Sequence, residues 1–375
     1  MSKLKTTIQN LKLSDITIAV LGSHSALDVC RGAKDLGFKT LVIVQKGRDK
    51  TYAKYYKSNG EIGCVDEVIE LENFKDILSE KVQKELLKRN AIFIPHRSFE
   101  VYINDYNAIE KKFKVPMFGN KFLLKCEERG TGNNVDQYKI MEEAGIRYPK
   151  QFKNPSEIDG PCVVKVMAKY LGFERGFFIV NSPETFYSRS QELIGQGRIT
   201  QEALDRAILE EYLVGVQVNF NYFYSPLHKR VELIGTDTRR QTNAEGYTKV
   251  APDDYKLVRD KYGITFEEAG HVSVTVLESL LEDAFAMGER FVKASQKLYK
   301  PGVIGPFGLQ TIIIPGPPKK EIIVFDVSPR MPGSPGIFAT PYSGYLYGKN
   351  ISMGRRVAME IKEAIEKGEL RKILT

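Results

Sequence analysis

Short apolar runs alternate with helical segments over the first 120 residues of the chain. The runs are rich in β-branched residues, and the longer helical segment is charged and amphipathic. Strands that alternate with helices in this way predict a parallel sheet with crossover helices. The expected strands cover residues 16–21, 40–44, 66–71 and 91–95, the expected helices cover residues 26–36 and 73–89, and residues 117–119 close the domain.

The pattern is more varied in the rest of the chain. Residues 217–224 (QVNFNYFY) alternate polar and apolar positions, which predicts a half-buried strand, and residues 230–236 are expected to pair with it. Residues 238–247 (TRRQTNAEGY) and 330–345 are expected to be loops. Further strands are expected at residues 161–166 and 207–213, and helices at residues 121–129, 134–144, 183–195, 199–206, 279–299 and 352–367.

Two β-rich runs, residues 309–314 and 321–327, are separated by the turn cluster PGPPKK and predict a β-hairpin. Gln310 lies near the start of the first strand and Asp326 near the end of the second. In an antiparallel pair these ends meet, and Arg330 follows closely. Oxygen ligands of this kind suit Mg²⁺ bound to substrate phosphates. The alternative is an edge hairpin with ordinary polar residues at its strand ends.

Two loops rich in His, Ser and Arg follow the first and the fourth expected strand. They cover residues 22–25 and 96–98, with His24 and Ser98 as candidate ligand-binding residues. Open α/β sheets bind ligands at the carboxyl ends of their strands, and the start of a helix can hold a phosphate. The first loop lacks GxGxxG, so a dinucleotide fingerprint is absent. A loop histidine without a role is the alternative for His24.

A lysine stands in the middle of an otherwise apolar strand, PCVVKV. Lys165 is expected to need an anion or a carboxylate as partner, because an unpaired buried charge is costly, and a phosphate is one such partner. Residues 168–180 carry Gly172 and Gly176 and predict a turn between strands. The backbone N–H groups of such a turn can cradle phosphate.

Composition and charge narrow the class of protein. The 375 residues are 42% hydrophobic and 27% charged, which is typical of a soluble globular protein of two or three domains. The net charge of +8 is scattered along the chain, which favours small anionic ligands over nucleic acid. No apolar run predicts a membrane span or a signal region. Four widely spaced cysteines are expected to be reduced thiols of a cytoplasmic protein: Cys30, Cys64, Cys126 and Cys162.

The order of these features resembles the ATP-grasp superfamily over nearly the whole chain. An α/β domain is followed by the strand lysine, the glycine turn, an acidic strand and the hairpin. Within the superfamily, the chain is similar to the archaeal formate-dependent synthetases that formylate 5-aminoimidazole-4-carboxamide ribonucleotide (AICAR). The matching segments are GSHSALD (22–28), FIPHRSF (93–99), EEYLVG (210–215), NYFYSP (221–226), ESLLEDAFAMGERFVKA (278–294), IGPFGLQ (304–310), FDVSPR (325–330) and TPYSGYLYGKNISMGRR (340–356).

The resemblance implies a fold and an activity. The fold is α/β with α+β elements, an ATP-grasp fold with an N-terminal Rossmann-like domain in residues 1–120 and two ATP-grasp subdomains in residues 121–213 and 214–375. The activity is that of a cytoplasmic carbon–nitrogen ligase of IMP biosynthesis that uses ATP with Mg²⁺ or Mn²⁺. Formate would attack the γ-phosphate of ATP, and the amine of AICAR would then attack formyl phosphate. The family is also expected to form homo-oligomers, either trimers or hexamers.

The same resemblance implies roles for individual residues. His24, Ser98 and His271 would contact AICAR, and His24, with a pKa near working pH, would orient or deprotonate the amine. Arg330 would stabilise charge during transfer, and residues 170–176 and 238–247 would act as lids. The metal positions would be Gln310 and Asp326, and the ATP site would consist of Lys139, Lys165, Glu210, Glu211, Tyr212, Leu213 and Asn243.

Three features depart from the family pattern. Related enzymes commonly carry Glu at both metal positions, where this chain has Gln310 and Asp326, and the neutral Gln is expected to weaken Mg²⁺ binding. The turn at residues 170–176 is poorer in glycine, and His271 stands where an amide is expected. Two alternatives therefore stay open. One is a ligase that joins a different carboxylate and amine, and the other is a nucleotide-binding paralogue with little catalysis.

Overall fold

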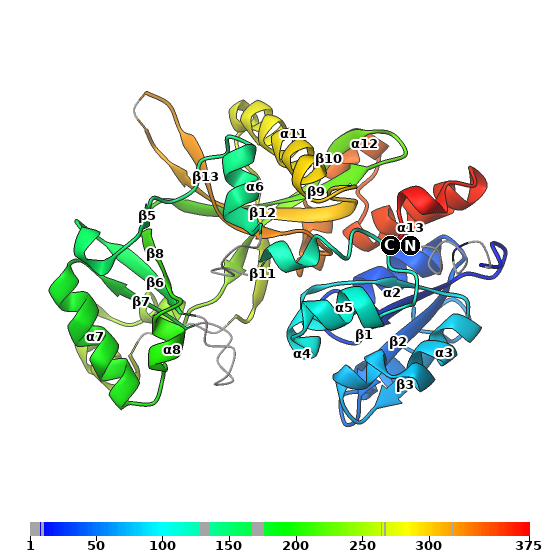
Figure 1. Ribbon diagram of the computed structural model, residues 1–375, viewed down its shortest axis with the longest axis horizontal. Coiled ribbons are helices and arrows are strands. Elements are labelled where there is room, and N and C mark those ends of the chain that lie inside the picture. Colours follow the sequence, from blue (N-terminus) through cyan, green and yellow to red (C-terminus); the bar gives the residue numbers. More distant parts are fainter. Residues whose placement is uncertain are drawn as a thin grey trace.

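The computed structural model contains three β-sheets arranged along the length of the molecule (Figure 1). It describes residues 8, 11–127, 135–166, 176–263, 265, 268–316 and 318–375. A four-stranded N-terminal sheet lies at one end, a smaller lobe with another four-stranded sheet lies at the other end, and a five-stranded central sheet lies between them. None of the described helices is both long and apolar enough to cross a membrane.

The N-terminal sheet is parallel, with strand order β3–β2–β1–β4, as the alternating pattern predicts. Strands β1 and β2 are apolar and buried, because helices cover both faces of the sheet. The strands are β1 (Thr17–Leu21), β2 (Lys39–Gln45), β3 (Glu67–Leu71) and β4 (Ala91–Ile94), and the helices are α2 (Ala26–Asp35), α3 (Glu80–Lys88), α4 (Arg97–Ile103) and α5 (Tyr106–Lys112).

The smaller lobe has an antiparallel sheet with strand order β5–β8–β6–β7. One helix, α7, begins at Pro183 behind the cap Ser182 and packs Phe186 and Leu193 into the core of the lobe. The elements of the smaller lobe are β5 (Gln151–Phe152), β6 (Cys162–Val166), β7 (Gly176–Val180), α7 (Pro183–Gly195), α8 (Gln201–Leu204) and β8 (Ile208–Glu211).

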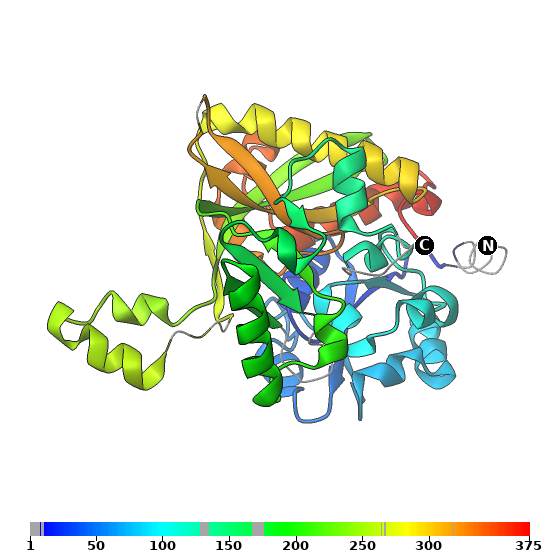
Figure 2. The same ribbon diagram turned by 60° about the vertical axis from the view of Figure 1, so that its left-hand side comes forward.

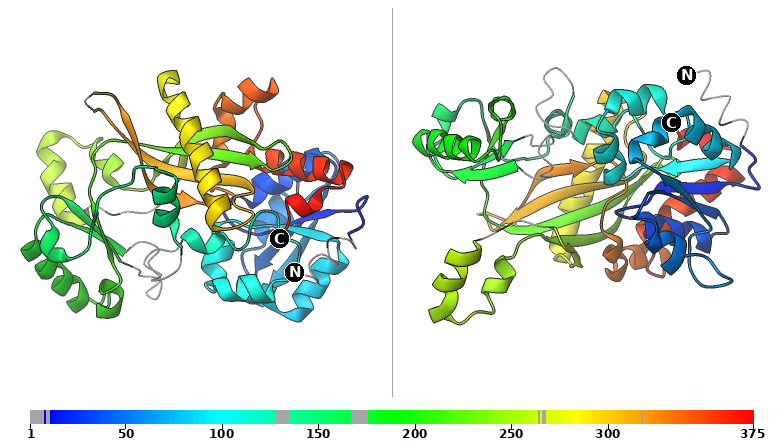
Figure 3. Two further views of the ribbon diagram at one scale, coloured as in Figure 1. Left: turned by 45° about the horizontal axis from the view of Figure 1, so that its top comes forward. Right: turned by 90° about the horizontal axis from the view of Figure 1, so that it is seen from below.

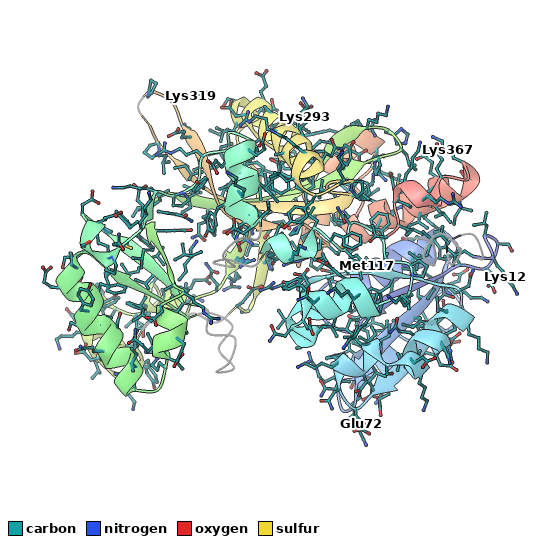
Figure 4. The ribbon with its side chains drawn as sticks, in the orientation of Figure 1. Lys12, Glu72, Met117, Lys293, Lys319 and Lys367 are labelled. Carbon is teal, nitrogen blue, oxygen red and sulfur yellow. The ribbon has the colours of Figure 1, made fainter. Side chains whose placement is uncertain are left out.

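The central sheet is antiparallel, with strand order β11–β10–β9–β12–β13, and it contains the expected hairpin as β12 and β13. Helices α11 and α6 cover one face (Figures 1 and 3), where the rings of Tyr222 and Phe291 stack on Phe307 with centroids 5.0 and 5.4 Å away. Figure 4 shows Lys319 at the outer tip of the hairpin. The elements are α6 (Gln137–Glu143), β9 (Val216–Ser225), β10 (Arg230–Arg240), β11 (Gly270–Ser273), α11 (Leu281–Leu298), β12 (Gly305–Ile314) and β13 (Glu321–Ser328).

The C-terminal helix α13 (Met353–Glu366) packs against α2 of the N-terminal domain. The helices approach closely because both contribute glycine: a Cβ on Gly32 would lie 2.2 Å from the Arg355 nitrogen, and one on Gly354 would lie 2.2 Å from the Asp28 carbonyl oxygen. The last residues of the chain then hydrogen-bond to residues 117–119, and the Thr375 N–H donates to the Met117 carbonyl oxygen at 2.8 Å. The expected domain boundaries stay a prediction, but α13 shares a core with the first domain.

A helical arm replaces part of the loop expected at residues 238–247. Residues 238–240 complete β10, and the arm consists of α9 (Ala244–Tyr247) and α10 (Pro252–Tyr262), which project away from the body in Figures 2 and 3. The expectation of a loop is therefore wrong for most of this segment, and its role as a lid stays a prediction. No residue of α10 is buried, so the apolar periodicity that would reveal a packed helix is absent.

Other expected elements differ in detail. The single helix expected over residues 73–89 is interrupted, because Ser79 is extended and its Oγ caps α3 by accepting from the Val82 N–H at 3.4 Å. Within the described part of residues 121–129 there is a 3-10 helix, Leu124–Glu127. The expected loop at residues 330–345 contains the 3-10 helix Pro335–Ala339 and the start of α12 (Tyr342–Tyr347). The four cysteines are buried free thiols, as expected.

Candidate functional site

The carboxyl ends of β1 and β4 lie side by side, as expected from the sequence. Ser98 Oγ donates a 3.0 Å hydrogen bond to Ser23 Oγ, and His96 Nε2–H donates to the Leu21 carbonyl oxygen at 2.8 Å. In the strand order β3–β2–β1–β4, the direction in which strands are added changes between β1 and β4. Open α/β sheets bind ligands at the carboxyl ends of the strands at such a point. The two loops therefore form one wall of the candidate site.

His24 has a positive φ of 53°, a region that non-glycine residues seldom occupy outside turns and functional sites. Its ring stacks on His96 with centroids 5.3 Å apart. The Ser25 hydroxyl donates its proton to the Pro332 carbonyl oxygen, so it accepts a hydrogen bond from His24 Nδ1–H at 3.0 Å. The neutral ring then presents Nε2 as a hydrogen-bond acceptor.

The charge state of His24 follows from its surroundings. His24 keeps an exposed surface, but the protein packed around its ring lowers its pKa below the usual range, and His96, Arg330, His271 and Arg239 lower it further by charge repulsion. These surroundings disfavour the imidazolium form, and the role of His24 toward the amine stays a prediction. The ring is suited to accept a hydrogen bond rather than to act as a strong base.

His271 lies in β11 with each ring nitrogen on a carboxylate. Nδ1–H donates to Asp237 Oδ2 at 2.5 Å, and Nε2–H donates to Glu268 Oε1 at 3.1 Å. Burial opposes the charge, but these two partners raise the pKa of His271 to about 9. Ser334 Oγ lies 3.0 Å from Nδ1. The residue at the position where the resemblance predicts a neutral amide is therefore a cation.

A row of hydrogen-bonding side chains crosses the central sheet on the face away from α11. Gln310 Nε2 donates to Asp326 Oδ2 at 3.0 Å, and Asn219 Nδ2 donates to Asp237 Oδ2 at 2.9 Å. Asn221 Nδ2 donates to Asp237 Oδ1 at 2.6 Å, so Asp237 connects the row to β11. Directly opposed residues share a face of the sheet. In strand order, these are Asp326 on β13, Gln310 on β12, Asn219 on β9 and Asp237 on β10.

The hairpin pair presents one carboxamide and one carboxylate at a buried position, where Gln310 is 5% exposed. A β-bulge at Phe325 interrupts the pairing next to Asp326, and such bulges are common beside active sites. The pair fits a Mg²⁺ ion that keeps phosphate and water ligands, because such an ion needs only one or two protein groups. Among the residues that the structure describes, no cluster of three or more His, Cys, Asp or Glu could hold a metal.

Arg330 is buried in a cluster of two arginines and two glutamates. Its Nη2 donates to Glu127 Oε1 at 2.7 Å, and its Nε lies 3.7 Å from Glu100 Oε1. Arg97 reaches the same two carboxylates at 3.2 and 3.6 Å. Burial, with Glu127 close by, raises the pKa of Glu100 to about 8. Arg330 therefore belongs to a network that joins β13 to the N-terminal domain, and its part in catalysis stays a prediction.

Lys165 has the carboxylate partner that its position in the strand requires. It forms an ion pair with the buried Glu210 of β8, whose other oxygen accepts from the Tyr138 hydroxyl. Lys165 Nζ also donates to the Phe325 carbonyl oxygen at 3.4 Å. Because Phe325 is the bulge residue beside Asp326, Lys165 links the smaller lobe to the hairpin.

Two expected ATP-binding residues are engaged elsewhere. Lys139 forms a surface ion pair with Glu142 of the same helix at 2.7 Å. Asn243 closes the base of the arm, with Oδ1 accepting from the Thr265 N–H at 2.8 Å and Nδ2 donating to the Gly263 carbonyl oxygen at 3.1 Å. The roles of both residues in ATP binding stay predictions. Of the expected phosphate turn at residues 170–176, all but the last residue lie outside the described residues.

The expected adenine segment begins at the end of β8, where Glu210 is buried and Glu211 is partly exposed. The Tyr212 N–H donates to the Pro161 carbonyl oxygen at 2.8 Å, so this N–H is not free to read an adenine edge. The backbone of Leu213 stays the predicted contact, and the adenine role of the whole segment stays a prediction.

Four residues of the site were not identified from the sequence, which are Asn219, Asn221, Asp237 and Arg239. The period-two pattern of residues 217–224 placed Asn219 and Asn221 on one face, but on the exposed face of a half-buried strand. Both are buried because Asp237 accepts their amide hydrogens. Two Asn two residues apart in a strand are the signal that could have indicated a polar site. Arg239 and Asp237 fell at the border of the presumed loop.

The arrangement of these sheets is the ATP-grasp fold, and solved structures share it. An IMP biosynthesis protein PurP from Thermococcus kodakaraensis matches with a TM-score of 0.68 and 27% identity, over 96% of this chain and 100% of that chain. A purK N5-carboxyaminoimidazole ribonucleotide synthetase solved as an ADP complex matches with a TM-score of 0.58 and 14% identity, over 93% and 77% of the two chains, which is a likeness of fold.

The family is shown by sequence. Two family models match, a protein of unknown function (DUF1246) at residues 18–152 and a domain of unknown function (DUF1297) at residues 185–375. Proteins named 5-formaminoimidazole-4-carboxamide-1-(beta)-D-ribofuranosyl 5'-monophosphate synthetase are 38% identical in Methanopyrus kandleri, over 97% of this chain and 96% of the relative, and 39% identical in Methanothermobacter thermautotrophicus, over 98% and 97%. The chain belongs to this synthetase family and is a ligase.

Proposed function

We propose that this protein formylates AICAR to 5-formaminoimidazole-4-carboxamide ribonucleotide with ATP and formate, releasing ADP and phosphate. Membership of the synthetase family supports this reaction. The observation that carries it is the polar row from Asp326 to Asp237, because that row connects the hairpin to His271 beside His24. A site that phosphorylates formate and a site that presents an amine then share one face of the sheet.

In this proposal the ATP phosphates lie between the smaller lobe and the hairpin. Lys165, oriented by Glu210 and the Phe325 carbonyl, faces the transferred phosphoryl group. Asp326 and the carboxamide oxygen of Gln310 would hold a divalent cation, Mg²⁺ or Mn²⁺, which would supply further charge neutralisation. Gln310 has to rotate its amide for this role, because its NH₂ group now donates to Asp326.

The chemistry depends on activation of formate. Formate oxygen attacks the γ-phosphorus of ATP and ADP leaves, which turns a poor acylating agent into formyl phosphate. The 5-amino group of AICAR attacks the formyl carbon and phosphate leaves. His24 Nε2 accepts a hydrogen bond from that amine and orients its lone pair, while Ser98 binds the same substrate. Positioning and charge supply most of the rate in such transfers, and formyl phosphate has to be kept from water.

A turnover assay with ATP, Mg²⁺, formate and AICAR tests the proposal. ADP release that depends on both formate and AICAR, with a formylated product, is the expected result, and its absence refutes the reaction. Release of ADP with another acid would indicate a different ligase. Tight ATP binding without turnover would indicate a nucleotide-binding paralogue.

A set of lysine variants sharpens the assay. Lys165→Met should lower kcat by about 100-fold or more, because a preorganised charge at the phosphoryl group is lost. Lys297→Met is the matched control and should stay within about twofold of the parent, because its ammonium pairs with Glu143 on the surface. A large loss in Lys139→Met would support the predicted role of Lys139 in the ATP site, and unchanged kcat would contradict it. The expected assembly of the chain into a trimer or a hexamer stays a prediction, which light scattering can test.

A further inference from the structure

Arg239 and His271 are directly opposed on β10 and β11, on the face that carries Asp237. Both are cations, since the carboxylates around His271 raise its pKa to about 9. Their side chains are 24% and 12% exposed, so water screens them poorly. Like charges directly opposed on a sheet are destabilising, and such a pair therefore requires an anion.

Glu268 supplies that anion in the structure. Its Oε1 lies 3.1 Å from His271 Nε2 and its Oε2 lies 3.7 Å from Arg239 Nη1, so one carboxylate bridges the two cations. The contact with arginine is too long for a hydrogen bond. Arg239 Nε is buried and has no hydrogen-bond partner among the described residues. The cations are therefore only partly satisfied by the protein.

We propose that Arg239 and His271 form a binding site for the phosphate oxygens of a nucleotide substrate, a position that Glu268 fills when the substrate is absent. A phosphate monoester offers three acceptor oxygens, so it can engage both the unpartnered Arg239 Nε–H and the Nη1 group that a single carboxylate reaches only at 3.7 Å. Asp237 stays bound to the opposite side of His271 and keeps the imidazolium charged when Glu268 leaves.

The position favours the ribonucleotide over ATP as the source of the phosphate. Three strand spacings separate Asp326 from Asp237, which is roughly 14 Å, and Arg239 lies two residues further along β10. Formyl phosphate has to form at the hairpin and cannot reach that far. A mononucleotide whose amine points toward the hairpin can extend its 5'-phosphate to Arg239, past His24. This assignment rests on the proposed function.

Calorimetric binding of AICAR, of its riboside without phosphate, and of ATP tests the site. Arg239→Gln should weaken AICAR binding by about 10- to 100-fold, the range for a charged hydrogen bond, and leave the riboside within about twofold. Arg240→Gln is the matched control, because the neighbouring arginine points to the other face and pairs with Glu245 on the arm. A loss confined to ATP would assign the same site to the triphosphate, and unchanged affinity for both nucleotides overturns the proposal.

A second variant moves affinity in the opposite direction. Glu268→Gln removes the competing anion and should tighten AICAR binding by about twofold to fivefold, a gain that a misfolded protein does not give. Unchanged or weaker binding in Glu268→Gln would refute the displacement of Glu268. Failure of the proposed reaction is separate, since it would appear as AICAR binding without formate-dependent ADP release in the parent enzyme. Turnover with wild-type affinities in Arg239→Gln would refute the site alone.

Discussion

Gln310 and Asp326 are directly opposed on β12 and β13, and the Gln310 amide donates a 3.0 Å hydrogen bond to the Asp326 carboxylate. The pair therefore carries a single negative charge at a largely buried position. A second carboxylate at position 310 would face the first at hydrogen-bond distance, and two such groups repel each other unless a cation or a proton lies between them. The residue at position 310 thus sets how strongly the hairpin depends on metal.

Gln310→Glu should make the protein more dependent on metal and bind it more tightly. The Mg²⁺ concentration for half-maximal turnover is expected to fall on the order of tenfold, because ligand charge tunes the affinity for such ions. In EDTA the variant should melt below the parent, and Mg²⁺ should restore it. Gln310→Met is the control without a ligand oxygen and should show neither effect. An unchanged Mg²⁺ requirement in Gln310→Glu would remove residue 310 from the metal site.

A buried ion network fastens α13 to the central sheet and makes a prediction about stability. Arg356 donates to both oxygens of Glu232, at 2.7 and 3.2 Å, and its guanidinium lies 4.0 Å from the Phe223 ring centre. Glu232→Gln should lower the free energy of unfolding by about 3–5 kcal/mol, because the buried positive charge of Arg356 then loses the negative charge of its bidentate partner. Arg230→Gln removes an exposed partner of the same glutamate and should cost less than about 1 kcal/mol.

Urea unfolding of the two variants measures this difference. Equal losses of unfolding free energy in both variants would show that the buried and the exposed arginine contribute alike. That result would contradict the expectation that a buried ion pair, once broken, costs more than an exposed one. Melting of α13 alone in Glu232→Gln would show that the helix is a separately cooperative unit.

The parts that the sequence predicted are those set by local pattern. Alternating strands and helices predicted the neighbouring loops of His24 and Ser98, and the turn cluster predicted the pairing of Gln310 with Asp326. A carboxylate partner for Lys165 followed from the cost of an unpaired buried charge. Each of these inferences needs only nearest neighbours in the chain or a single physical rule.

The parts that it missed depend on tertiary pairing. The register of β9 against both β10 and β12 brings Asn219 next to Asp237, and no local pattern gives that register. The pKa of His24 depends on charged residues far away in the sequence, such as His271 and Arg330. The arm was missed because α10 buries nothing, so the pattern that predicts helices was absent.

The contact of α2 with α13 predicts a steric cost for one methyl group. A Cβ on Gly354 would lie 2.2 Å from the Asp28 carbonyl oxygen, and the Gly354 N–H donates to the Asp28 side chain at 3.0 Å. Gly354→Ala should therefore lower the free energy of unfolding by about 1–3 kcal/mol, as overpacking does. Gly195→Ala in α7 is the control, because its Cβ meets nothing within 4 Å, and it should be neutral or stabilising by up to about 1 kcal/mol. Thermal melts compare the two, and equal shifts would contradict the close helix contact.

His271 should make stability fall as pH rises from neutral to alkaline. Asp237 and Glu268 raise its pKa to about 9 in the folded state, against an ordinary value of 6.5, so the native protein binds the extra proton between these values. The stabilisation is complete below pH 6.5 and lost by pH 9 to 10, and it amounts to at most about 3 kcal/mol. His271→Asn removes this dependence, so the stability curves of parent and variant should converge with rising pH in urea unfolding. Parallel curves for His271→Asn would show that the carboxylates do not hold the ring charged.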